Sequence, residues 1–211
     1  MAEPQRPTDI AHPWSHLPRS DPAQPAPGLH DLHPDDLPTG GRPPGIPARF
    51  ADAHLDQLDG EIARVAAEWI DGHMAANVVL LGAVGVGKTH AAAALARHAW
   101  QQGRRIRFAP VVELMDELRP NGGRPQALDE ACAVDLLVLD DIGCEKPTDW
   151  TGERLYAVIN RRWLECRPTI ATSNLAPERV EERIGSQAWS RLYHDAIGLR
   201  LAGDDRRRSA A

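Results

Sequence analysis

The sequence carries, at residues 82–89, the stretch Gly82-Ala83-Val84-Gly85-Val86-Gly87-Lys88-Thr89. This stretch matches the phosphate-binding-loop pattern G-x-x-x-x-G-K-[ST] at every position. A short apolar run, Asn77–Leu81 (NVVLL), precedes it, and an alanine-rich segment follows it. A phosphate-binding loop joins a buried strand to the start of a helix, and this context distinguishes it from a chance glycine-rich turn. The stretch therefore predicts an α/β fold built on a mostly parallel sheet.

The residue types in this loop suit a phosphate ligand. Its three glycines let the backbone turn tightly and direct N–H groups inward, whereas Val84 and Val86 only shape the loop. The positive end of the following helix points at the same place. Lys88 is expected to reach the β- and γ-phosphates, and the Thr89 hydroxyl is expected to bind Mg²⁺. The loop thus predicts ATP and Mg²⁺ as ligands.

A second strand carries the acids that such a site requires. Residues 136–141 (LLVLDD) place two carboxylates after four apolar residues. Ligands of open α/β sheets bind at the carboxyl ends of the strands. We therefore expect Asp140 to hold Mg²⁺, directly or through water, and Asp141 to polarise the attacking water. The alternative is a strand followed by an acidic turn or a helix cap, which the preceding phosphate loop disfavours.

Residues 169–174 (TIATSN) form another apolar stretch that ends in polar residues. At the end of that strand, Asn174 is expected to hydrogen-bond the γ-phosphate or the attacking water. An asparagine that only starts a turn is the alternative. The order of the motifs along the chain favours the catalytic interpretation, because the phosphate loop comes first, the acids second and the polar strand end third.

Periodicity and turn residues predict the remaining elements. Apolar residues between Leu55 and Trp69 recur at three- and four-residue steps, which indicates one or two amphipathic helices that end at Gly72. Further strands are expected at 105–109, 134–140, 168–173 and 196–201, and helices at 88–102, 111–118, 151–166, 177–184 and 186–194. Alternating strands and helices predict a P-loop sheet with helices on both faces, and we expect no C-terminal helical lid.

Proline density divides the chain. Residues 1–48 hold 12 of the 18 prolines, interleaved with histidine, aspartate and glycine. Such a composition does not bury enough apolar surface to offset the entropy lost on ordering. We therefore expect residues 1–48 to be a disordered, proline-rich tail and residues 49–207 to be one ATPase domain.

Charge and composition exclude several classes of protein. The net charge of −6 excludes a uniformly basic nucleic-acid coat, so any DNA contact must come from a local patch. Arginines 104, 105, 107, 119 and 124 could line a pore, although a solvated basic face is the alternative. The three cysteines show no CxxC pairing, and no apolar run approaches the length of a membrane span. A reduced, cytoplasmic setting is expected.

Together these stretches resemble the AAA+ ATPases of the DnaC/IstB kind, which comprise helicase loaders and the ATP-binding partners of insertion-sequence transposases. The resemblance extends over about residues 46–207. Beyond the phosphate loop, the matching stretches are Ile46–Phe50 (IPARF), Asp135–Gly143 (DLLVLDDIG), Pro168–Leu175 (PTIATSNL), Ser190–Leu192 (SRL) and Leu201–Arg207.

The resemblance implies roles that the residues alone do not. Asn174 would be the sensor-1 residue, and Arg191 would sit in the arginine element that completes the ATP site of a neighbouring subunit. Family members often carry a second arginine four residues earlier, where this chain has Gln187. Such loaders act as ATP-dependent oligomers on single-stranded DNA and hand it to a replicative helicase. The short proline-rich tail is unlike a standard helicase-binding domain.

Two other functions remain open from the sequence. An IstB-like protein would use ATP-bound oligomers on duplex DNA to position a transposase. A non-hydrolysing switch would use ATP only to set the oligomeric state or partner binding, and Asp141 is compatible with it because its side chain is one methylene shorter than the glutamate of many such ATPases. An ATPase that assists a replicative helicase is the leading expectation.

Overall fold

The computed structural model describes residues 45–71, 76–203 and 205. Within these residues, five strands form one sheet in the order β2-β3-β4-β1-β5, and every neighbouring pair is parallel. The strands are β1 (Val78–Gly82), β2 (Ile106–Pro110), β3 (Leu136–Asp140), β4 (Thr169–Ser173) and β5 (Ile197–Leu201). The expected disordered tail lies almost entirely outside the described residues.

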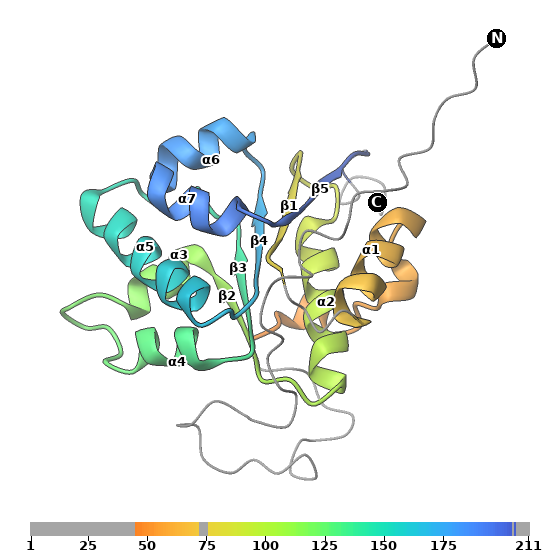
Figure 1. Cartoon of the computed structure of the whole chain (residues 1–211), viewed down its shortest axis with the longest axis horizontal. Coiled ribbons are helices and arrows are strands. Elements are labelled where there is room, and N and C mark those ends of the chain that lie inside the picture. Colours follow the sequence, from red (N-terminus) through yellow and green to blue (C-terminus); the bar gives the residue numbers. More distant parts are fainter. Residues whose placement is uncertain (1–44, 72–75, 204, 206–211) are drawn as a thin grey trace.

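Helices cover both faces of the sheet, as the sequence predicted (Figure 1). One face packs against α1 (Gly60–Asp71) and α2 (Lys88–Gln101), with the short 3₁₀ turns η2 (Ala48–Phe50) and η3 (Leu55–Gln57) beside them. The other face packs against α3 (Val111–Glu117), α4 (Ala127–Ala133), α5 (Asp149–Leu164), α6 (Pro177–Ile184) and α7 (Ser186–Tyr193). Among the described helices, none is long and apolar enough to cross a membrane.

The strands are nearly continuous apolar runs because both faces of the sheet are covered. Successive residues of β1 point to opposite sides, so that Leu80 joins the core under α2 and Val79 joins the core under α5. The α2 helix presents buried alanines, among them Ala91 to Ala94, to the sheet. These small side chains let the helix that follows the phosphate loop lie close to the central strands.

For every strand, and for every predicted helix from α2 onwards, the first and last residues lie within two residues of the predicted ones. The region between Leu55 and Trp69 splits into η3 and α1. One helix was missed, α4. Its C-terminal carbonyls at Ala131 and Val134 accept hydrogen bonds of 2.9 Å from the buried Arg162 of α5. That support comes from another part of the fold, so no local pattern in the sequence indicates it.

Candidate nucleotide-binding site

The parallel sheet brings three polar segments to one edge. Since β4 lies between β1 and β3, the residues that follow these strands are neighbours at their carboxyl ends. A cavity of about 480 Å³ opens there. The predicted residues on its wall are Val84, Gly85, Gly87, Lys88, Thr89, Asp141 and Asn174, and Arg49, Phe50, Gln57 and His90 also line it. A volume of this size is in the range of small-molecule sites.

The phosphate loop has the backbone conformation that its glycines permit. Gly82, Gly85 and Gly87 have φ values of 156°, 84° and 104°. A Cβ atom added to Gly82 would lie 2.3 Å from the carbonyl oxygen of Leu201 in β5, so a larger residue cannot stand there. Val84 is exposed at the loop tip, whereas Val86 is buried beneath the loop.

Lys88 begins α2 and is almost completely buried. Its ammonium group donates hydrogen bonds to the carbonyl oxygens of Gly82 and Ala83, at 3.0 and 2.9 Å. The lysine is therefore folded back against its own loop, where its charge and the N-terminal end of α2 face the same cavity.

Asp140, the last residue of β3, is 7% exposed. Its Oδ1 accepts a hydrogen bond of 2.7 Å from the hydroxyl of Thr172 on β4. Burial raises the pKa of Asp140, and the Thr172 bond, the nearby Thr89 side chain and the Lys88 charge each oppose that rise. The carboxylate thus stands directly beside the phosphate loop.

Thr172 was not predicted as a site residue. In addition to its bond to Asp140, its Oγ1 accepts a 2.9 Å hydrogen bond from the backbone N–H of Asp141. Its carbonyl oxygen accepts from Ile142 at 2.8 Å. Asp141 has a φ of 58°, a left-handed conformation that aspartate tolerates better than most residues. Thr172 therefore fixes the turn that brings Asp141 to the cavity wall.

Asn174 is exposed at the end of β4 and lines the same cavity as Asp141. Burial raises the pKa of the neighbouring Cys144 thiol, and the Asn174 side chain acts to lower it. The predicted sensor residue and the predicted water-polarising acid therefore share one wall of the cavity.

The oxygen donors of the site fit Mg²⁺ that arrives with a nucleotide. Among the described residues, no group of three or more histidine, cysteine or acidic side chains could hold a metal ion by itself. Mg²⁺ is commonly bound by one or two carboxylates together with waters and substrate phosphates. The Asp140 carboxylate and the Thr89 hydroxyl are neighbouring hard oxygen donors, which is a suitable pair for such an ion.

Other residues that line the cavity are suited to a flat base. The rings of Phe50 and His90 meet edge to face, with centroids 6.4 Å apart. Arg49 and Gln57 add polar groups to the same cavity. An aromatic surface with a few polar groups is typical of sites for heteroaromatic ligands. No role in the site was predicted for the N-terminal stretch Ile46–Phe50.

An acidic side chain also reaches the phosphate loop. Residues Gly82 and Leu201 are paired where β1 and β5 end, so the chain that leaves β5 passes the loop. A Cβ atom added to Gly85 would lie 1.9 Å from Oδ1 of Asp205, which means that this carboxylate packs directly on the glycine. No local pattern in the sequence indicates this contact.

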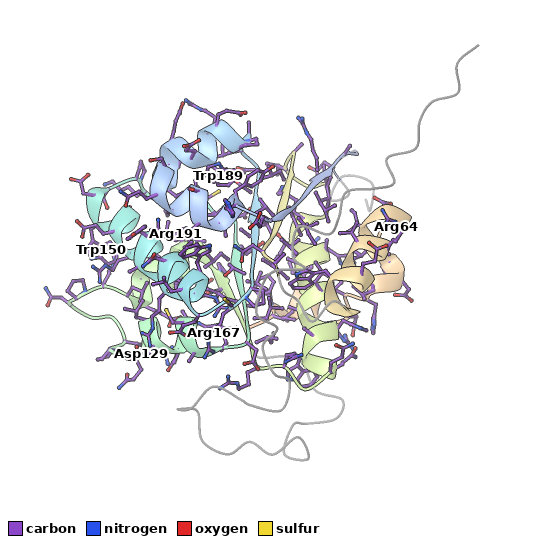
Figure 2. The ribbon with its side chains drawn as sticks, viewed as in Figure 1. Arg64, Asp129, Trp150, Arg167, Trp189 and Arg191 are labelled. Carbon is purple, nitrogen blue, oxygen red and sulfur yellow. The ribbon has the colours of Figure 1, made fainter. Side chains whose placement is uncertain are left out.

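Arg191 does not line the cavity of its own chain. Its carbonyl oxygen accepts a 3.3 Å hydrogen bond from Asn77, which precedes β1, whereas the phosphate loop follows β1. A five-residue strand is about 16 Å long, more than an arginine side chain spans. Its guanidinium group instead lies over the rings of Tyr156 and Trp163 on α5. Figure 2 labels Arg191 in the region of α5 and α7.

The arginines that were considered for a pore are largely held by acids of their own chain. Arg105 pairs with Asp135 at 2.7 Å, and Arg107 pairs with Glu117 at 2.7 Å. Arg124 pairs with both Glu117 and Glu130. Paired arginines have less positive charge to offer phosphates, so these contacts favour the alternative of a solvated basic face.

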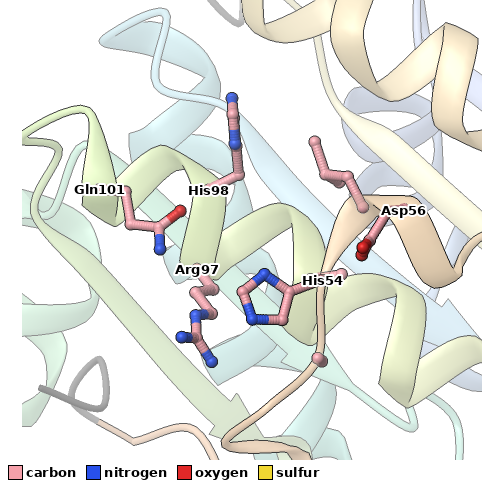
Figure 3. A pocket seen from close by; sticks show the side chains of 8 residues that line it. His54, Asp56, Arg97, His98 and Gln101 are labelled. Atoms are coloured by element: carbon pink, nitrogen blue, oxygen red, sulfur yellow. The ribbon is translucent and has the colours of Figure 1, made fainter. Parts of the chain in front are cut away.

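A smaller cavity of about 210 Å³ lies between η3 and α2 (Figure 3). His54, Asp56, His98 and Gln101 surround it, and Arg97 donates a hydrogen bond to the carbonyl oxygen of Ala51. None of the predicted site residues lines this cavity.

Comparison with known proteins matches residues 53–210 to the family described as IstB-like ATP binding protein. A Mycobacterium tuberculosis protein named as an ATP-binding protein in an insertion sequence is 34% identical over 128 residues, which are 57% of this chain and 49% of that protein. The replicative helicase loader DnaC of Escherichia coli is 30% identical over 158 residues, 68% of this chain and 64% of that protein. The matches thus span about half to two thirds of these relatives.

Solved structures show the same fold. The crystal structure of the DnaC helicase loader superposes with a TM-score of 0.64 at 23% identity, covering 74% of this chain and 100% of that one. DnaI gives a TM-score of 0.68 at 23% identity, covering 78% and 96%. DnaA from Aquifex aeolicus, bound to the nucleotide analogue AMPPCP, gives 0.63 at 22% identity, covering 77% and 53%. At these identities the likeness concerns the fold alone.

Proposed function

The chain belongs to the family of IstB-like ATP-binding proteins, within the AAA+ class, and we propose that it hydrolyses ATP with Mg²⁺ to load or remodel a replicative helicase on single-stranded DNA. One observation carries the enzymatic part of this proposal. The Thr89 side chain lies close enough to the Asp140 carboxylate, beside Lys88, to lower its pKa, although Thr89 belongs to α2 and Asp140 to β3.

Each residue of the site has a distinct task in the proposed reaction. The N–H groups of the phosphate loop and the Lys88 ammonium bind the β- and γ-phosphates. Asp140 and Thr89 are the oxygen donors for Mg²⁺, which supplies positive charge to the phosphates when it is bound. Asp141 accepts a hydrogen bond from the attacking water and orients it, and Asn174 holds the γ-phosphate or that water.

The proposed site is incomplete within one chain. Hydrolysis by P-loop enzymes is greatly accelerated by an arginine that stabilises charge on the transferred phosphoryl group. Arg191 is held at the other end of β1 from the phosphate loop, so it serves this purpose only for a neighbouring copy. ATP turnover would therefore depend on self-assembly.

Two relatives support different biological partners. The 30% identity to a replicative helicase loader supports the helicase, and the 34% identity to an insertion-sequence protein supports a transposase as the second candidate. The loader match covers 68% of this chain, and the insertion-sequence relatives cover 57% to 69%, so coverage does not separate the two candidates. We test the helicase first.

A loading assay separates these candidates. The chain is mixed with the replicative helicase of the same organism, circular single-stranded DNA, ATP and Mg²⁺, and helicase bound to DNA is measured after gel filtration. The proposal expects DNA-bound helicase to increase with the wild-type chain and not with Lys88→Ala. No increase with either chain, together with ATP-dependent binding of the chain to a transposase on duplex DNA, would favour the second candidate.

A further inference from the structure

The Arg191 guanidinium lies over two aromatic rings of a single helix. The side chains of Tyr156 and Trp163 on α5 are seven residues apart, which places them on one helix face about 10.5 Å apart along its axis. The central carbon of the guanidinium is 5.0 Å from the Tyr156 ring centroid and 5.5 Å from that of Trp163. The spacing of the two rings therefore suits one guanidinium group held between them.

Stacking on rings uses the faces of a guanidinium group and leaves its in-plane N–H donors at the edge. In Arg191, Nη1 donates a hydrogen bond of 3.2 Å to the carbonyl oxygen of Gln187. Its Nε is buried without a hydrogen-bond partner in the described part of the chain, and Nη2 donates no hydrogen bond to that part, so Nη2 is the donor left for another copy. The arginine thus keeps donor capacity that its own chain does not use, in a fixed orientation.

The main chain at this position is fixed as well. The side chain of Asn77 donates to the carbonyl oxygens of Arg191 and Leu192, and its Oδ1 accepts from the N–H of Thr169 at 2.9 Å. The start of the sheet therefore holds the end of α7. Trp163, by contrast, is 47% exposed and belongs to neither core cluster of the described residues. Its ring contacts the Arg191 guanidinium instead.

We propose that Tyr156 and Trp163 are positioning residues that hold Arg191 ready for the γ-phosphate of ATP bound to a neighbouring copy of this chain. This inference rests on the proposed function, because it requires Arg191 to act between subunits. A long arginine side chain loses rotational entropy when it engages a phosphate. Two flanking rings remove part of that freedom before assembly, which speeds the reaction without any change in ATP binding.

A subunit-mixing experiment tests the inference. Lys88→Ala copies retain Arg191 but lack the phosphate-binding lysine, and Arg191→Ala copies retain the lysine but lack the arginine. In an equimolar random assembly, about a quarter of all chains have an intact loop next to an intact arginine. We expect the mixture to release phosphate at about that fraction of the wild-type rate per chain, and each variant alone to be nearly inactive.

The aromatic residue is then changed in one partner only. Trp163→Ala introduced into the Lys88→Ala copy, which supplies the arginine, is expected to lower the rate of the mixture about three- to tenfold, as expected for the loss of a cation–π contact. Trp163→Phe in that copy is expected to restore most of the rate, because phenylalanine keeps an aromatic face. Fluorescent ATP should bind the Arg191→Ala copy equally well in all mixtures.

The control places Trp163→Ala in the Arg191→Ala copy, where no arginine remains to be positioned. A smaller rate loss in this arrangement than in the other supports the positioning role, because folding and assembly defects affect both arrangements alike. Equal losses in both arrangements, or no loss in either, would overturn the inference alone. Absence of any rescue in the parent mixture would overturn the intersubunit role of Arg191 and therefore the proposed function on which the inference rests.

Discussion

The hydroxyl of Thr172 donates a 2.7 Å hydrogen bond to the carboxylate of Asp140 and also accepts one from the N–H of Asp141. One side chain of β4 thereby connects the proposed metal-binding acid to the proposed water-orienting acid. Because both partners of the bond to Asp140 are buried, the bond is worth more than a comparable one in water. The relationship gives Thr172 a place in the site although Thr172 does not line the cavity.

Thr172→Val should test this role, because valine has nearly the same shape and lacks the hydroxyl. The buried Asp140 carboxylate would lose a donor, which costs about 1–3 kcal/mol of stability. ATP turnover should fall about tenfold, because Asp141 would also lose its anchor. Urea unfolding and phosphate release measure the two effects. Thr172→Ser retains the hydroxyl and should stay within about threefold of wild type; an equal loss in both variants would contradict the role.

Asp140→Asn should stabilise the chain while it abolishes turnover. Burial raises the pKa of Asp140, so an ionised carboxylate at this position costs stability in the folded chain at neutral pH. Asparagine keeps the shape and removes the charge. Without nucleotide, we expect the melting temperature at pH 7 to rise by about 2–4 °C, the change that about 1 kcal/mol causes in a domain of this size.

The pH dependence of this gain follows from the sign of the shift. A folded-state pKa above the ordinary aspartate value means that the protonated form stabilises the fold at low pH, and that this contribution is lost as the pH rises through the raised pKa. The difference in melting temperature between Asp140→Asn and wild type should therefore shrink as the solution is acidified. A difference in melting temperature that grows towards acid pH would refute a raised pKa of Asp140 as its cause.

Asp205→Asn should strengthen nucleotide binding. The Asp205 carboxylate packs on Gly85 of the phosphate loop, where it repels an incoming phosphate. We expect the dissociation constants for ATP and for inorganic pyrophosphate to fall about threefold or more, since both ligands use the loop. Glu178→Gln, at an exposed acid of α6, serves as the control with no change. Weaker binding by Asp205→Asn would instead indicate that Asp205 contributes to nucleotide binding.

Arg162→Met should be strongly destabilising. The buried guanidinium donates to backbone carbonyls at the end of α4 and before β4, including Val134 at 2.9 Å and Pro168 at 2.6 Å. Each buried carbonyl left without a donor costs about 1–3 kcal/mol, so the total loss should reach about 3 kcal/mol or more. Arg161→Met is the matched control, because Arg161 makes only exposed ion pairs and should cost less than about 1 kcal/mol. Urea unfolding of both variants measures the two losses in the free energy of unfolding.

The sequence predicted the sheet and the segments that meet at its edge, because both depend on contiguous residues. The phosphate loop and the run that ends at Asp140 are readable without knowledge of any neighbour. Thr172, Asp205 and the ring pair around Arg191 were missed, because their roles arise from strand register and helix packing. The α4 helix was missed for the same reason, since its end is satisfied by Arg162, about thirty residues away.

The central claim is an ATPase whose site is assembled from neighbouring copies, and phosphate release per chain, measured over a wide range of protein concentrations with ATP and Mg²⁺, tests it most directly. The account predicts that this rate rises with protein concentration until assembly is complete and is nearly absent in Lys88→Ala. A rate that is independent of concentration, or that is the same in Lys88→Ala as in wild type, would contradict it.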